Sequence, residues 1–72
     1  MTTETKNIRE SETYKSLDTF TATGYAEGFI EATEDQWVAA WQYLHDTKLA
    51  YQLQGWFGRA AVQLVERGII LP

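Results

Sequence analysis

The sequence predicts a mainly α fold, with a small helical domain of two to three helices over residues 17–72 and a flexible polar arm over residues 1–16. A helix-start signal at Thr33 is followed by apolar residues at helical spacing, and a second stripe of this kind ends just before Gly68. The same region contains all three tryptophans, at positions 37, 41 and 56. These observations mark residues 33–68 as the part of the chain that folds around a core.

The first 16 residues are rich in Thr, Glu, Ser, Lys and Asn. Apart from the initiator Met1, only Ile8 and Tyr14 are large and apolar there. Such a segment buries too little apolar surface to offset the entropy lost on ordering, so we expect a flexible arm.

Residues 17–32 give weaker signals. Loose alternation and threonines in residues 17–23 predict a short strand or an extended segment that lies over the helices. Gly24 is expected to break the chain before a short helix over residues 25–32. In that helix Tyr25 and Phe29, at i and i+4, share one side.

The first main helix is predicted over residues 33–47. Thr33 is the expected N-cap and Gln36 its capping-box partner, while acidic residues occupy the first turn, where the helix dipole favours negative charge. Its buried face comprises Trp37, Ala40, Trp41 and Leu44.

The second main helix is predicted over residues 52–67, with Gly68 as the left-handed residue that ends it. The apolar residues 69–71 are expected to fold back over the helix pair. The predicted apolar face of this helix comprises Leu53, Phe57, Ala60, Ala61 and Leu64.

Composition limits the classes of function. The 72 residues carry a net charge of −4, and residues 1–32 alone hold six acidic against three basic residues. This charge disfavours binding to nucleic acid, because it repels phosphate backbones. Without cysteine, a domain this small lacks the disulfides and thiolate zinc sites that usually support it, so self-association as a homodimer is the expected support. The polar N-terminus and the lack of a membrane-length apolar run predict a soluble cytoplasmic protein.

The C-terminal half carries a family resemblance. Asp46 and Thr47 precede the run Leu-Ala-Tyr-Gln-Leu-Gln-Gly at residues 49–55, which is followed by Gly-Arg at 58–59 and Leu-Val-Glu-Arg-Gly-Ile-Ile at 64–70. This pattern resembles a family of short uncharacterised proteins from tailed bacteriophages. The chain departs from the family pattern at Lys48, where glycine is frequent, at Tyr51, where Trp is frequent, and at residues 56–57, where a His-Tyr pair is frequent. The resemblance implies a phage origin and a fold, and it implies no activity.

The sequence indicates no enzyme, cofactor or metal site. His45 is the only histidine, and neither a nucleophile nor a second metal ligand accompanies it, so a capping or surface role is favoured over catalysis. Two helices joined by a turn also suggest DNA reading. The outer face of the second helix offers Arg59 and Gln63 but also Val62 and Glu66, and the whole protein is acidic, so DNA reading is the least favoured alternative.

The predicted partner-binding residues lie near the start of the second helix: Tyr51, Gln54, Trp56 and Arg59. Arg and Trp are enriched among residues that dominate binding energy. The ordinary alternative is a surface Arg59 with a weak ion pair to Asp46. Likewise, Gly55 and Gly58 are explained either by close approach to a Trp of the preceding helix or by an exposed binding surface.

The leading functional hypothesis is a non-enzymatic accessory phage protein, a small acidic protein-interaction module that modulates a host or phage protein. The alternative is a protein that binds or sequesters a nucleotide-like ligand at a dimer interface. In that alternative Trp and Tyr stack on a base, and Arg59 with Lys48 contacts phosphate.

Overall fold

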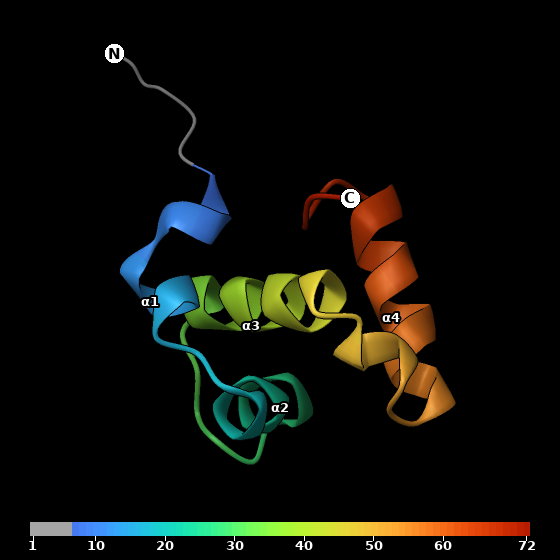
Figure 1. Ribbon diagram of the computed structural model, residues 1–72, viewed down its shortest axis with the longest axis horizontal. Coiled ribbons are helices and arrows are strands. Elements are labelled where there is room, and N and C mark those ends of the chain that lie inside the picture. The colour runs from blue at the N-terminus through green and yellow to red at the C-terminus, as the bar shows by residue number, and fades with distance from the viewer. Residues whose placement is uncertain (1–6) are drawn as a thin grey trace.

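The computed structural model describes residues 7–72, and all regular structure among them is helical (Figure 1). The elements, with η for a 3₁₀ turn, are η1 (Ile8–Glu10), α1 (Glu12–Lys15), α2 (Thr19–Glu27), α3 (Glu34–Asp46), η2 (Leu49–Tyr51) and α4 (Gly55–Glu66). The predicted mainly α fold is confirmed, although the described residues form four α-helices and not two to three. None of these helices has the length and apolar character needed to cross a bilayer.

Helix α3 is the centre of the molecule, and every other element contacts it. Figure 1 shows α3 across the middle, α2 below it, α4 crossing near its C-terminal end, and the N-terminal turns beside its other end. The capping box is confirmed, since Thr33 Oγ1 accepts from the Gln36 amide at 3.1 Å and Gln36 Oε1 accepts from the Thr33 amide at 2.8 Å. After α3, Lys48 takes a left-handed conformation with φ 69°.

The core lies where α3, η2 and α4 meet. The rings of Trp41 and Phe57, each 2% exposed, have centroids 5.9 Å apart, and Leu44 is fully buried beside them. Trp37 is only partly buried and packs against this cluster. The predicted inward orientation of Trp41 is therefore confirmed.

Helix α4 begins at Gly55, three residues after the predicted start, because residues 49–51 form the separate turn η2. Leu53 accordingly lies outside α4 and is 37% exposed, which corrects its place on the predicted apolar face. Gly68 adopts the predicted left-handed conformation with φ 76°. The tail folds back as expected and buries Ile70 to 2% exposure.

The prediction of a strand or extended segment over residues 17–23 is wrong, and so is the predicted helix over 25–32, because α2 spans Thr19–Glu27. Asp18 caps α2 through a 2.8 Å bond from the Thr21 amide. Gly24 does not break the helix. A Cβ there would lie 2.5 Å from Ile30 Cδ1, so glycine allows the chain after α2 to approach its backbone.

The predicted flexible arm over residues 1–16 also needs correction. Residues 1–6 lie outside the described part of the chain, but residues 7–16 form η1 and α1, and both pack on α3. Asn7 and Ser11 cap these turns, accepting from the Arg9 amide at 2.8 Å and the Tyr14 amide at 3.1 Å. This segment has few apolar side chains to bury, and polar contacts with α3 hold it in place instead.

Candidate functional site

Among the described residues, the most exposed large apolar side chains belong to Phe20 and Phe29, which are 79% and 82% exposed. Phe20 lies in the first turn of α2, and Phe29 follows Gly28, the left-handed residue with φ 89° that ends the helix. Helix α2 packs on α3 through small residues, with Ala22 and Gly24 buried. Both rings therefore remain in solvent, whereas Tyr25, which was predicted to share one side with Phe29, packs against the core.

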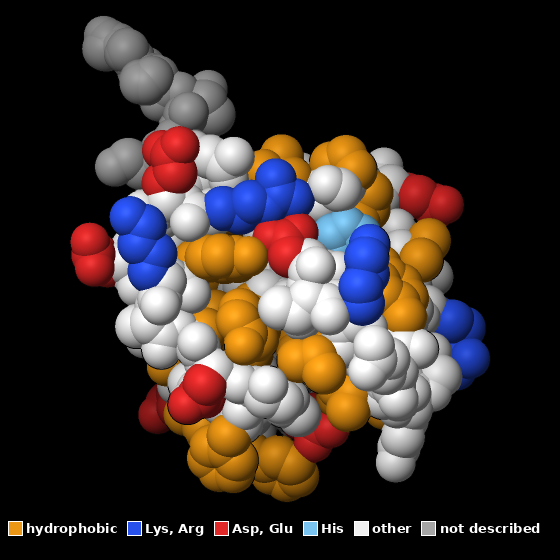
Figure 2. All heavy atoms as spheres, viewed as in Figure 1, with side chains coloured by type: hydrophobic (Ala, Val, Ile, Leu, Met, Phe, Trp, Pro, Cys, Tyr) orange, Lys and Arg blue, Asp and Glu red, His pale blue; other side chains and the backbone are white. Residues whose placement is uncertain are grey.

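Acidic residues surround this part of the chain. Residues 16–47 contain no Lys or Arg, whereas Asp18, Glu27 and Glu31 flank the two phenylalanines in sequence and are all exposed. The amide of Thr21 donates to Asp18 and lowers the pKa of its carboxyl, which keeps it charged. In Figure 2 the area over α2 shows hydrophobic and acidic side chains but no basic ones. We call these exposed residues on α2 and beside its two ends the phenylalanine face: Phe20, Phe29, Asp18, Glu27 and Glu31.

The four residues predicted to bind a partner are all exposed, with Tyr51 at 42% and Trp56 at 40%. Tyr51 and Arg59 line one open groove of about 420 Å³. Gln54 is the N-cap residue of α4, and its side chain makes no capping hydrogen bond. We call this cavity the α4 groove, and its lining is Tyr51, Gly58, Arg59, Val62, Gln63 and Glu66.

The two helical glycines have separate explanations. A Cβ on Gly58 would lie 3.3 Å from Tyr51 Cδ1, so this glycine allows η2 to approach α4 closely. The prediction that it allows approach of a tryptophan from the preceding helix is wrong. A Cβ on Gly55 would lie 3.2 Å from a terminal nitrogen of Arg59, so the guanidinium lies over Gly55. Arg59 therefore does not reach Asp46, whose ion pair is with Arg9.

Trp56 is held by other aromatic rings. It stacks on Phe57 with centroids 4.1 Å apart and meets the edge of Trp41 at 6.2 Å. Its exposed part is thus continuous with the core, so a substitution at Trp56 changes packing as well as surface.

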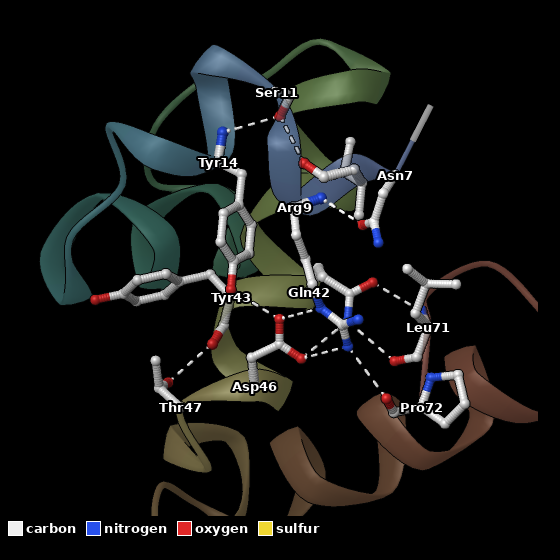
Figure 3. A network of polar contacts seen from close by, with 11 residues as sticks. Asn7, Arg9, Ser11, Tyr14, Gln42, Tyr43, Asp46, Thr47, Leu71 and Pro72 are labelled. Atoms are coloured by element: carbon white, nitrogen blue, oxygen red, sulfur yellow. Dashed lines mark hydrogen bonds and ion pairs between the residues drawn. The ribbon is translucent and has the colours of Figure 1, made fainter. Parts of the chain in front are cut away.

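A polar network around Asp46 joins both ends of the described chain to α3 (Figure 3). The Asp46 carboxylate accepts from Arg9 Nε at 2.8 Å, from the Tyr14 hydroxyl at 2.7 Å and from Gln42 Nε2 at 3.1 Å. Gln42, which is fully buried, also binds both backbone groups of Leu71. This network holds η1, α1 and the C-terminal tail on α3, whereas α2 is held on α3 by the packing of Ala22 and Gly24.

The network shifts the pKa values of its members. Burial acts to raise the pKa of Asp46, but the hydrogen bonds from Arg9, Tyr14 and Gln42 outweigh it and lower that pKa below the ordinary value. Burial first, and then the bond to Asp46, raise the pKa of Tyr14 to about 12. At neutral pH the carboxylate is charged and the phenol protonated, as the observed bonds require.

A separate side-chain contact joins His45 to Tyr51. His45 Nδ1 lies 2.7 Å from the Tyr51 hydroxyl, at the junction of α3 and η2. Because this bond fixes η2 against α3, it gives His45 a structural role.

Comparison with known proteins adds no relative, since neither a protein-family model, a curated protein nor a solved structure matches the chain. The resemblance to phage proteins thus stays a prediction from the sequence. Sequence reasoning also missed the phenylalanine face. The available signal was the long interval without Lys or Arg, within which both phenylalanines lie.

Proposed function

We propose that the protein is a non-enzymatic, acidic protein-interaction module that binds its partner through the phenylalanine face. The observation that carries this proposal is the 79% and 82% exposure of Phe20 and Phe29. Exposed aromatic rings supply large apolar contact area at small cost in conformational entropy, which suits them to anchor an interface.

The charges around the rings indicate the chemistry of the partner. Asp18, Glu27 and Glu31 are exposed and lie within residues 16–47, which contain no Lys or Arg. A complementary protein surface has apolar pockets for two phenylalanines and a rim of Lys or Arg. The apolar pockets provide affinity, while the charges speed association and select among partners.

The origin and location of this activity rest on the sequence resemblance. If the chain is a phage accessory protein, it acts in the cytoplasm of the infected cell on a host or phage protein. The net charge of −4 supports a protein partner over nucleic acid.

The nucleotide-like ligand has less support. In the α4 groove Arg59 is accompanied by Glu66, which repels phosphate, and Lys48 is not among the lining residues. The phenylalanine face contains no basic group to meet a phosphate.

Affinity capture from bacterial lysate tests the proposal with two variants that separate the surfaces. The double substitution Phe20→Ser/Phe29→Ser removes the proposed anchors, and Trp56→Ala removes the anchor predicted from the sequence. We expect the first variant to lose the protein that wild type captures, with the dissociation constant raised about 100-fold or more. Trp56→Ala should retain it.

Circular dichroism and thermal unfolding of each variant serve as controls, because only folded variants are informative. Both phenylalanines are so exposed that their loss should leave the fold intact. Equal capture by wild type and the folded double variant would refute the phenylalanine face as the binding surface.

A further inference from the structure

We infer that the outer face of α4 pairs with a second copy of the chain in an antiparallel, two-fold symmetric dimer. This inference does not depend on the phenylalanine face, which lies on and just after α2. It concerns a stripe of residues that we call the α4 stripe: Gly55, Arg59, Val62 and Glu66.

The α4 stripe lies opposite the buried side of its helix. At 100° per residue its four members fall within an arc of about 60°, and the buried residues Phe57 and Ala61 lie on the far side. The spacings of four, three and four residues are those of a coiled-coil seam. Arg59 and Glu66 are exposed, and Val62 is 44% exposed.

A two-fold interface must be self-complementary, because the same patch is used by both copies. In an antiparallel pair with the usual alternation of seam positions, Val62 of one copy faces Arg59 of the other, and Glu66 faces Gly55. The guanidinium of Arg59 lies over Gly55 in the structure. Glu66 therefore meets that guanidinium at both ends of the interface, while Val62 packs on the aliphatic part of Arg59 at its centre.

The charges of α4 are poorly placed in a single copy. Glu66 is the last residue of the helix, where the helix dipole disfavours negative charge. At the other end, the first turn has no acidic residue and the Gln54 side chain makes no capping bond. Antiparallel pairing places Glu66 of one copy beside the N-terminus of α4 in the other. The unfavourable charge at the end of one helix then becomes a favourable charge at the start of its partner, which lacks an acidic residue of its own there.

The shape of the surface also fits a second helix. Three residues of the stripe, Arg59, Val62 and Glu66, line the α4 groove, which has a volume of about 420 Å³. Gly58 leaves room between Tyr51 and α4. The contact is short, at 12 residues per helix. Because stable interfaces bury about 800 Å² per partner, we expect a weak dimer, with a dissociation constant on the order of 10–100 μM.

Charge reversal gives a specific test by sedimentation equilibrium. The variants Arg59→Glu and Glu66→Arg each place like charges opposite one another in their own homodimers, so each should weaken self-association at least about tenfold. An equimolar mixture of the two should form a heterodimer. In that heterodimer the introduced glutamate of the first variant faces the introduced arginine of the second, and the unchanged Glu66 of the first faces the unchanged Arg59 of the second. A substitution that only disturbed the structure of the monomer could not restore association in this mixture.

Two controls match the change in charge but lie off the stripe: Arg67→Glu and Glu10→Arg. Both should dimerise as wild type does. Monomeric wild type at millimolar concentration, or no association in the mixture of the two folded single variants, would overturn the proposal. Neither result changes what is expected of partner capture through Phe20 and Phe29. Failure of the dimer proposal can therefore be distinguished from failure of the proposed function.

Discussion

The guanidinium of Arg9 and the carboxylate of Asp46 form a two-point contact, with Nε 2.8 Å from Oδ2 and Nη2 2.9 Å from Oδ1. The same guanidinium donates to the carbonyl of Pro72 at 3.1 Å. One side chain thus connects the N-terminal turn, the central helix and the C-terminal tail. A bidentate pair of this kind fixes orientation as well as distance.

Loss of the carboxylate should destabilise the whole domain. We predict that Asp46→Ala lowers the free energy of unfolding by about 2–3 kcal/mol, because Arg9, Tyr14 and Gln42 each lose an acceptor in a partly buried setting. Urea unfolding measures this value. Glu31→Ala, an exposed residue outside the network, should change it by less than about 0.5 kcal/mol, and equal effects would argue against the network.

The network also predicts acid sensitivity. The pKa of Asp46 is lower in the folded chain than in the unfolded chain, where it is about 3.9, so its contribution is present above that value and is lost as pH falls through the folded pKa. Unfolding curves from neutral pH down to about pH 2 should therefore fall less steeply for Asp46→Asn than for wild type. Parallel curves would contradict the predicted shift.

Tyr14 has the opposite dependence. Its pKa is about 12 in the fold, against about 10 in an unfolded chain, so its contribution is complete below pH 10 and is lost as pH rises from 10 to 12. We expect Tyr14→Phe to remove the last step of tyrosinate absorbance in an alkaline titration. A late step that persists in the variant would assign it to another tyrosine.

The left-handed conformation at Lys48 offers a stabilising substitution. A non-glycine residue with φ 69° costs about 1–2 kcal/mol, while glycine costs about 0.5–1 kcal/mol in unfolded-state entropy. Lys48→Gly should therefore raise the free energy of unfolding by about 0.5–1 kcal/mol, and Lys48→Ala should leave it nearly unchanged. Thermal or urea unfolding checks both, and destabilisation by Lys48→Gly would show that the lysine side chain contributes more than the backbone strain.

The elements that could be predicted from sequence are those with local determinants. The Thr33 and Gln36 capping box, the left-handed Gly68 and the apolar spacing around Trp41 each act within a few residues, and all three are confirmed. Their stabilising contacts are encoded where the helix begins, packs or ends.

The N-terminal elements could not be predicted in the same way. Helix α2 contains strand-favouring Thr and Phe, and it is stabilised by the Asp18 cap and by packing of Ala22 and Gly24 on α3. Arg9 binds Asp46 across a separation of 37 residues, and no local sequence pattern predicts this contact. These long-range contacts order the segment that composition assigned to a flexible arm.

The four residues predicted to bind a partner are all exposed, and their role in binding stays a prediction. Tyr51 and Arg59 line one groove, which the sequence did not predict because it is formed by the packing of η2 beside α4. Phe29 was predicted to share one side of a short helix with Tyr25, and only the three-dimensional placement of α2 and of the chain after it shows that Phe20 and Phe29 are both exposed.

Backbone amide exchange on the complex with the captured partner tests the central claim most directly. The phenylalanine face predicts that binding slows exchange in residues 18–31 while residues 55–66 exchange as they do in the free protein. Slowed exchange confined to residues 55–66, with residues 18–31 unchanged, would contradict it.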